Sequence, residues 1–298
     1  MTRAIIITNP AAARSDEAHL LASRRRLVRG GLAVEVAPTG AAGDGQRLAR
    51  AAVEDGVEVV IAHGGDGTAM DVAAGLIGSE HRLGLLPAGT GNLLAGNLGI
   101  SRSWRVASDL ILRGAVRSVD VGRLTTRQVV RYFAVACGAG FDADLMRSTA
   151  ARHKRAFGMG AYVATAVGLA TEFKRSLLRV ETDGVAHEAR AAMILIANCG
   201  DLIPGLLRIR HDIRPDDGVF DVAILDAESL PGAAHVLWRL VLRRPDGHPG
   251  ISFLRARSLR VTAEPALPAQ ADGEECGTTP LEVELVPLAL HVLAPRAD

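Results

Sequence analysis

Lysine, aromatic residues and excess charge of either sign are scarce in this sequence, which argues against a nucleic-acid partner. Only two of the 34 basic residues are lysines, Lys154 and Lys174, and because acidic residues number 33 the net charge is +1. Such a balance gives no overall electrostatic attraction to nucleic acid. Aromatic residues make up 3% of the chain, too few for a platform on which single-stranded bases would stack. We therefore expect no nucleic-acid partner.

Cysteines and long apolar runs are also few. Cys137, Cys199 and Cys276 form no Cys-x-x-Cys pair, which argues against a zinc cluster or a disulfide framework and is typical of a reducing compartment. The most apolar run, residues 191–199, is less than half of the roughly 20 residues that span a bilayer, and the first residues lack a signal-peptide pattern. We expect a soluble, cytoplasmic protein that can still contact the inner face of a membrane peripherally.

The sequence pattern changes near residue 118 and predicts two domains. At 298 residues, with 48% hydrophobic and 22% charged residues, the chain is long enough for two folded domains. Before residue 118, strand-like apolar runs alternate with helical segments; the runs are 4–8, 33–37, 57–62 and 83–86, and the helical segments are 15–30, 44–54 and 69–77. This alternation predicts a parallel sheet with helices on both faces.

After residue 118 the pattern consists mainly of strands. Candidate strands are 118–121, 129–137, 178–182, 189–197, 220–225, 258–263 and 281–293, with helical stretches at 158–173 and 230–242. Short strands separated by Gly, Pro and Asp are typical of a β-sandwich. The predicted fold is therefore mixed α/β, with a parallel-sheet domain in residues 1–118 and a β-sandwich domain with inserted helices in residues 119–298.

Two glycine-rich loops are candidates for binding an anion. Residues 64–68, Gly-Gly-Asp-Gly-Thr, lie between a predicted strand and a helix, where free N–H groups and the positive end of a helix dipole meet. The alternative is an ordinary turn capped by Asp66 or Thr68. Residues 87–92, Pro-Ala-Gly-Thr-Gly-Asn, follow the next strand, and such loops meet at one edge of a parallel sheet. Together they could grip a chain of phosphates without a Walker lysine.

The order of motifs along the chain resembles the diacylglycerol kinase catalytic family, which is similar to sphingosine and ceramide kinases. The matching motifs are Asn9-Pro10, Thr39, residues 64–68, residues 87–92, Asp120, residues 138–142, Asp217-Gly218 and Asp272-Gly273-Glu274. NAD kinases and phosphofructokinases share the first glycine loop but not the later series. The resemblance implies a nucleotide-binding domain in residues 1–118, a lipid or substrate domain in residues 119–298, and catalysis in the cleft between them.

The resemblance also implies roles for individual residues. The ATP site would be formed by Asn9, Thr39, Gly64, Gly65, Gly67, Thr68, Gly89, Thr90, Gly91 and Asn92. Asp66 would orient magnesium-bound phosphates or the acceptor, and Glu274 would assist with nucleotide or metal. Asp272 would be the general base, because an alcohol is a poor nucleophile and a positioned carboxylate accepts its proton during phosphoryl transfer. The alternative for Asp272 is structural, since Asp-Gly is a strong two-residue hairpin signal.

Two aspartates raise the question of a structural metal. In bacterial relatives an aspartate network near Asp120 and Asp217 is linked to magnesium, which prefers oxygen ligands. The residue three before Asp217, a ligand in some relatives, is Arg214 here, and a guanidinium cannot coordinate a cation. Either Asp212 or Asp216 replaces it, or the site is lost. A simple turn at Asp217-Gly218 is the further alternative.

Two loops depart from the family pattern, and two other segments are candidates for lipid contact. Residues 11–14 read Ala-Ala-Ala-Arg where many relatives have a glycine-containing phosphate loop, and Leu93 stands where many bacterial diacylglycerol kinases have Asp.

Apolar residues beside arginines in segments 152–177 and 238–244 would suit an anionic membrane surface. Core-facing helices with solvated arginines are the alternative.

We predict an ATP- and magnesium-dependent kinase of lipid metabolism and phospholipid biosynthesis, which phosphorylates the hydroxyl of a lipid such as diacylglycerol. The alternatives are a kinase for a sphingoid base or another lipid alcohol, and a soluble kinase related to NAD kinases with a non-lipid acceptor. A nucleotide-binding regulatory protein without turnover is disfavoured by the presence of Asp66, Asp272 and Glu274. A homodimer is compatible with these predictions, and the sequence leaves the oligomeric state open.

Overall fold

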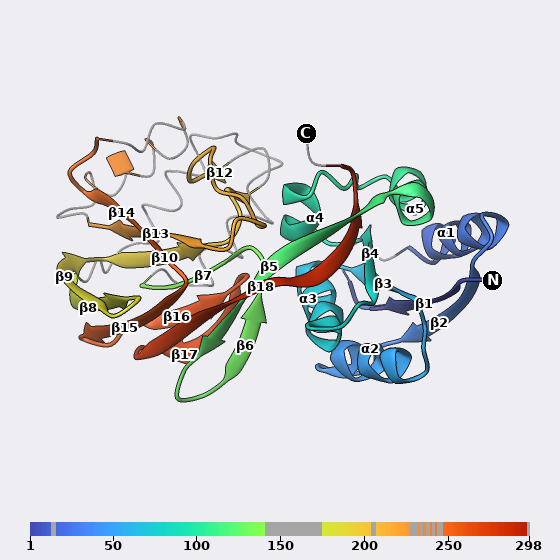
Figure 1. The fold of residues 1–298 in the computed structure, drawn as a ribbon, viewed down its shortest axis with the longest axis horizontal. Coiled ribbons are helices and arrows are strands. Elements are labelled where there is room, and N and C mark those ends of the chain that lie inside the picture. The colour runs from blue at the N-terminus through green and yellow to red at the C-terminus, as the bar shows by residue number, and fades with distance from the viewer. Residues whose placement is uncertain are drawn as a thin grey trace. The chain divides into compact units, whose positions relative to one another are not determined.

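The chain forms two compact units. A computed structural model describes residues 1–12, 16–140, 175–203, 207–226, 232, 235–236, 239, 242 and 247–296. Unit 1 comprises Met1–Asp120 and Pro287–Asp298, and unit 2 comprises Val121–Val286 (Figure 1). The sequence-based division at residue 118 assigned the last residues of the chain to the second domain. Pro287–Asp298 instead belongs to unit 1, because the end of the chain adds a strand to the sheet of that unit.

Unit 1 is a parallel sheet with helices on both faces. Its elements are β1 (Arg3–Thr8), α1 (Glu17–Arg29), β2 (Ala33–Pro38), α2 (Asp44–Glu54), β3 (Val59–Gly64), α3 (Asp66–Leu76), β4 (Arg82–Pro87), α4 (Leu93–Asn97), α5 (Trp104–Arg113), the start of β5 (Ala115–Thr125) and the end of β18 (Leu281–Ala294). The strand order is β2-β1-β3-β4, and β18 lies parallel to β4. Figure 1 shows α1 and α5 on one face, and α2 and α3 on the other. The predicted parallel α/β fold is confirmed.

Local signals in the sequence set both ends of helix α1 in unit 1. The Asp16 side chain accepts a hydrogen bond from Ala18 N at 2.8 Å and caps α1, which ends at Gly30 and the left-handed Gly31 (φ 98°). Helix α2 has the bounds that the sequence predicts. Helix α3 differs, because it begins at Asp66, three residues before its predicted start. Most of the first glycine-rich loop is therefore the first turn of a helix.

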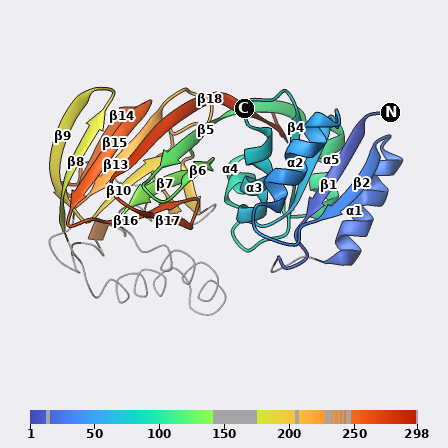
Figure 2. The same cartoon turned by 90° about the horizontal axis from the view of Figure 1, so that it is seen from below.

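Unit 2 is a β-sandwich. Its described strands are the end of β5, β6 (Val130–Phe133), β7 (Ala136–Ala139), β8 (Ser176–Thr182), β9 (Val185–Ala191), β10 (Met193–Ala197), β11 (Asp201–Ile203), β12 (Leu207–Arg208), β13 (Phe220–Leu225), β14 (Ile251–Ala256), β15 (Ser258–Glu264), β16 (Pro268–Ala271), β17 (Glu274–Thr278) and the start of β18. One sheet contains β9-β8-β15-β18, with β5 beside β18 and β6 beside β5, and the other has the order β14-β13-β10-β7-β16-β17 (Figure 2). The predicted C-terminal sandwich is confirmed.

Apolar side chains from both sheets form the core of unit 2. Leu178 and Val180 of β8 belong to the same buried cluster as Ile194 and Ile196 of β10 and Phe220 of β13. Along β8 buried and exposed residues alternate strictly, as expected for a strand with one face against a core. The inner faces of the two sheets thus provide the apolar surface whose burial stabilises this unit.

Two predicted strands are each divided in two. The segment predicted at 129–137 forms β6 and β7, and the segment predicted at 189–197 forms β9 and β10. The second break falls at Ala192, whose N–H donates to Leu225 O on another strand. The strands β11, β12, β14, β16 and β17 were not predicted.

Some predictions lie outside the described part of the chain. These are the helix at 158–173 and most of the helix at 230–242. The basic and apolar residues of 152–174, together with Trp238, Leu240 and Val241, are outside it as well. Among the residues that are described, we find no helix with the length and apolar character needed to cross a membrane.

Candidate active site

The two glycine-rich loops meet at their backbones in unit 1. A Cβ atom on Gly89 would lie 2.4 Å from Gly65 Cα, so a larger residue at position 89 would force the loops apart. Just before this contact, Ala88 N donates to Gly64 O at 2.7 Å. The loops follow β3 and β4, which are neighbours in the sheet. The structure therefore brings together the two loops that the sequence singled out.

Asp66 holds the second loop against the first. Its carboxylate accepts hydrogen bonds from Asn92 N at 2.7 Å and from Leu93 N. Leu93 is the first residue of α4, so the carboxylate lies at the N-terminus of this helix. Burial raises the pKa of Asp66, while the N–H groups of Leu93 and Asn92 act in the opposite direction. Asp66 thus caps α4, whereas the sequence suggested a cap for α3.

Asn92 and Arg102 fix the carbonyl groups of the second loop. Asn92 is left-handed (φ 52°), and its side chain accepts from Gly89 N at 3.0 Å and donates to Gly89 O at 2.8 Å. Arg102 Nη2 donates to Thr90 O at 3.0 Å and to Gly91 O at 2.7 Å. Because a trans peptide is planar, turning the Thr90 carbonyl toward Arg102 turns the Gly91 N–H away from it. Sequence reasoning missed Arg102, which belongs to no recognisable motif.

The remaining predicted nucleotide residues lie at the same edge of the sheet. Asn9 follows β1, and its Nδ2 donates to Thr68 Oγ1 at 3.2 Å. Thr39 follows β2, and its N–H donates to Thr8 O at 2.8 Å. Thr68 and Gly67 lie in the first turn of α3, whose N-cap residue is Gly65 and therefore has no side chain to cap the helix. Backbone N–H groups and the positive end of the α3 dipole thus lie beside these polar side chains.

Asp272 occupies a tight hairpin turn in unit 2. Asp272 and Gly273 both have positive φ (47° and 84°) and join β16 to β17, where Ala271 pairs with Glu274. The backbone therefore adopts the two-residue hairpin that the Asp-Gly dipeptide favours. This accounts for the conformation of Asp272, and the role of its side chain is a separate question.

The Asp272 carboxylate binds three consecutive N–H groups. Its Oδ2 accepts from Ala134 N at 2.8 Å, and its Oδ1 accepts from Val135 N at 3.0 Å and Ala136 N at 2.9 Å. These bonds explain the break between β6 and β7, because the three N–H groups point to a side chain rather than to a neighbouring strand. Bonds from N–H to a carboxylate are strong and fix its orientation.

Ionisable neighbours of Asp272 include a buried thiol and an ion pair. Burial raises the pKa of Cys137, and the negative charge of Asp272 raises it further, so this thiol remains protonated. Glu274 is exposed and accepts a hydrogen bond from Arg131 Nη1. Arg131 on β6 is a second residue that sequence reasoning missed, because it lies 143 positions from Glu274 and in the other sheet of the sandwich.

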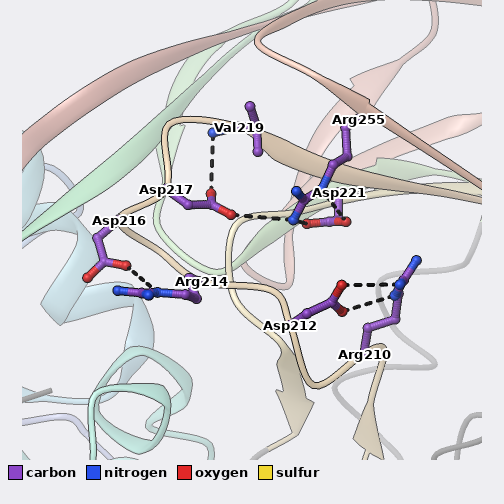
Figure 3. Close-up of polar contacts among 8 residues, drawn as sticks. All are labelled: Arg210, Asp212, Arg214, Asp216, Asp217, Val219, Asp221 and Arg255. Carbon is purple, nitrogen blue, oxygen red and sulfur yellow. Dashed lines mark hydrogen bonds and ion pairs between the residues drawn. The ribbon is translucent and has the colours of Figure 1, made fainter. Parts of the chain in front are cut away.

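The two aspartates proposed for a metal belong to different units. Asp120 is fully buried in unit 1, where its Oδ1 accepts from Leu288 N at 2.8 Å and links β5 to β18. Asp217 in unit 2 accepts from Val219 N and from Arg255 Nη2, each at 3.4 Å (Figure 3). Within the described ranges there is no group of three or more His, Cys, Asp or Glu residues suited to a metal ion.

Comparison with known proteins agrees with this architecture. Residues 3–124 match the model of the diacylglycerol kinase catalytic domain, and residues 135–294 match the YegS C-terminal NAD kinase beta sandwich-like domain. A Chromohalobacter salexigens protein named "Probable lipid kinase YegS-like" is 31% identical over 98% of this chain and 93% of its own length. The chain belongs to this diacylglycerol kinase family. The predicted family is thereby confirmed.

Other relatives extend the comparison. A diacylglycerol kinase of Bacillus subtilis is 27% identical over 99% of this chain and 97% of its own length. A Bacillus anthracis crystal structure, described as a candidate diacylglycerol kinase, shares the fold with a TM-score of 0.81 at 20% identity, covering 98% of this chain and 97% of that one. An uncharacterized Synechocystis protein is 28% identical over 81% of this chain, which spans only 56% of that longer relative.

Proposed function

We propose that the protein is an ATP-dependent lipid kinase, which transfers the γ-phosphoryl group of Mg-ATP to the hydroxyl of a lipid such as diacylglycerol. The observation that carries this proposal is the backbone contact between the two glycine-rich loops at Gly65 and Gly89. Beside this contact lie the glycine backbone of both loops, the N-terminus of α3 and polar side chains, all at one edge of the sheet. That combination is suited to a polyphosphate.

The nucleotide would be bound mainly by backbone groups and a helix dipole. Unit 1 contains no lysine, so no P-loop lysine is present to neutralise the phosphates. The residues assigned to ATP are Asn9, Thr39, Gly64, Gly65, Gly67, Thr68, Gly89, Thr90, Gly91 and Asn92. Arg102 adds a positive charge beside the second loop and binds the carbonyl oxygens of Thr90 and Gly91, which would turn them away from bound phosphates.

Asp66 has two roles in this proposal. The first is to tie the N-terminus of α4 to the first loop, for which its hydrogen bonds to Asn92 and Leu93 are the support. The second is to orient the magnesium-bound phosphates, because it is the only carboxylate within the two loops and magnesium prefers carboxylate oxygens. Magnesium bound with ATP would neutralise the charge on the phosphate oxygens.

Asp272 is the general base in this proposal. Its three backbone hydrogen bonds hold the carboxylate in one orientation, and the residue remains partly accessible. A fixed, ionised carboxylate accepts the proton of the acceptor hydroxyl while the oxygen attacks the γ-phosphorus. Glu274, the first residue of β17, is paired with Arg131 and would assist with nucleotide or metal binding.

The acceptor is proposed to be a lipid because relatives across nearly the whole chain are named as diacylglycerol or lipid kinases. Such an acceptor implies transient contact with a membrane surface. A sphingoid base is the second lipid alcohol to consider, and a soluble nucleotide acceptor would place the protein closer to NAD kinases in activity.

The test is phosphoryl transfer from γ-labelled ATP in the presence of magnesium. The protein is incubated separately with diacylglycerol in mixed micelles, with a sphingoid base in the same micelles, and with NAD⁺, and the products are separated by lipid extraction and chromatography. We expect label in phosphatidic acid. Label confined to the aqueous NAD⁺ product, or no product that exceeds a reaction without protein, would contradict the lipid assignment.

A further inference from the structure

Residues 210–217 of unit 2 carry alternating arginines and aspartates that pair with one another. Figure 3 shows Arg210 and Asp212 joined by two parallel contacts, Nε to Oδ1 at 3.0 Å and Nη2 to Oδ2 at 3.1 Å. Arg214 Nε donates to Asp216 Oδ1 at 3.1 Å. The two acids that the sequence offered as substitute metal ligands are thus each bound to an arginine two residues earlier.

Arg255 joins the other two aspartates of this region. The pairing of β13 with β14 places Arg255 directly opposite Asp221. Its Nε lies 3.2 Å from Asp221 Oδ1, and its Nη2 lies 3.3 Å from Asp221 Oδ2 and 3.4 Å from Asp217 Oδ2 (Figure 3). Asp221 is almost fully buried, and Asp217 lies in the turn that leads into β13. One guanidinium therefore connects the strand to the turn before it.

This arrangement does not fit a magnesium ion beside Asp217. Magnesium requires near-octahedral oxygen coordination, whereas a guanidinium offers only donors. A divalent ion at the Asp217 and Asp221 carboxylates would have to displace Arg255, since the two like charges would repel each other at such short range. The residues present thus disagree with the structural magnesium that the family resemblance implied.

The guanidinium of Arg255 is about half exposed and lies between the carboxylates of Asp217 and Asp221. The pKa of Arg255 is raised by its hydrogen bonds to Asp221 first, and the charges of Asp217 and Asp212 raise it as well. Three carboxylates thus favour one positive charge at this position. Arg260 also has a raised pKa, through Glu282 on the neighbouring strand, but it belongs to an exposed cross-strand pair and holds no turn.

We propose that Arg255 takes the place of a divalent cation in unit 2, holding the Asp217 turn to strand β13 and making the stability of this region independent of metal. The proposal concerns this structural position alone and is separate from the magnesium that accompanies ATP. It therefore stands or falls independently of the kinase assignment.

Thermal unfolding of the full chain without nucleotide tests this proposal. The melting temperature of the wild type is expected to be the same in EDTA, in millimolar MgCl2 and in millimolar CaCl2. Arg255→Met should melt roughly 3–10 °C lower in EDTA, because Asp221 then remains a buried carboxylate without its guanidinium. Added MgCl2 should recover part of that loss. The matched control Arg260→Met should melt close to the wild type and show no response to metal.

Two results would overturn the proposal. One is a fall in the wild-type melting temperature in EDTA, or a rise with MgCl2, since either would reveal a structural metal. The other is an Arg255→Met protein as stable as the wild type in EDTA. Should Arg255→Met fail to fold, Arg255→Lys provides the same comparison, because lysine keeps the charge but loses the two-pronged contact. Its melting temperature should be lower than that of the wild type, and an unchanged melting temperature would count against the assignment.

Discussion

Two Asp-Gly hairpins in the described part of unit 2 have nearly the same backbone conformation. Asp183-Gly184 joins β8 to β9 with φ of 47° and 87°, and Asp272-Gly273 joins β16 to β17 with φ of 47° and 84°. Both carboxylates accept hydrogen bonds from backbone N–H groups of another segment. Local sequence thus specifies the same turn twice.

The surroundings of the two carboxylates differ. Asp183 is exposed and accepts from Arg257 N at 3.2 Å and Ser258 N at 2.9 Å, in the short connection between β14 and β15. Asp272 is partly buried and binds the three N–H groups between β6 and β7. The difference teaches that the dipeptide determines a turn, whereas the segment facing the turn determines what the carboxylate can do.

The largest expected effect is the loss of activity in Asp272→Asn, with Asp183→Asn as the matched control. Asp272→Asn should lower kcat by about 10²–10⁴, the usual contribution of a general base, with little change in ATP affinity. Asp183→Asn should leave kcat unchanged. The measurements are kcat for transfer from labelled ATP to diacylglycerol, and calorimetric titration with a nonhydrolysable ATP analogue.

Stability must be followed in both variants, since each loses an acceptor for backbone N–H groups. We expect Asp272→Asn to lose about 1–3 kcal/mol of unfolding free energy, and the exposed Asp183→Asn to lose less than about 1 kcal/mol. Activity is therefore compared well below both melting temperatures. Equal loss of kcat in the two variants would mean that the hairpins matter only structurally, and would remove Asp272 from the catalytic assignment.

An intermediate effect is expected for a matched pair of glycines in unit 1. Gly89→Ala would place Cβ 2.4 Å from Gly65 Cα, whereas a Cβ on Gly40 would have its nearest neighbour, Asp44 Oδ2, at 3.6 Å. Overpacking against backbone costs about 1–3 kcal/mol and would separate the two loops. Gly89→Ala should therefore weaken binding of the ATP analogue by about tenfold or more, and Gly40→Ala should not. Wild-type affinity in Gly89→Ala would contradict the nucleotide site.

The smallest effect concerns the pH dependence of the exposed hairpin. The N–H of Ser258 is the main cause that lowers the pKa of Asp183, although burial opposes it slightly. A lowered pKa means that the ionised carboxylate stabilises the fold above its ordinary pKa of 3.8 and loses this effect as the pH falls through the folded value. The difference in unfolding free energy between wild type and Asp183→Asn should be below about 1 kcal/mol, because the group is exposed.

Urea unfolding of both proteins from neutral pH to about pH 2.5 measures this difference. It should be constant at neutral pH and shrink below about pH 4. A difference that grows as the pH falls would contradict the contact between Asp183 and Ser258.

Several features of the fold and the site could be predicted because their causes are local. The cap at Asp16 and the glycines after Arg29 predict α1 well. The early start of α3 was missed because glycines at 65 and 67 have poor helix propensity. This first turn is instead supported by the contact of Gly65 with Gly89, which only the pairing of β3 with β4 creates.

The sequence by itself determined the alternation of β1 to β4 with α1 to α3, both glycine-rich loops and the tendency of Asp272-Gly273 to form a turn, because periodicity and turn chemistry act between near neighbours. Tertiary structure alone decided that Asp66 caps α4 and that Asp272 divides a predicted strand. Those contacts join residues 26 and 138 positions apart, respectively. No local propensity specifies such bonds, since they exist only once separate strands have paired and brought their ends together.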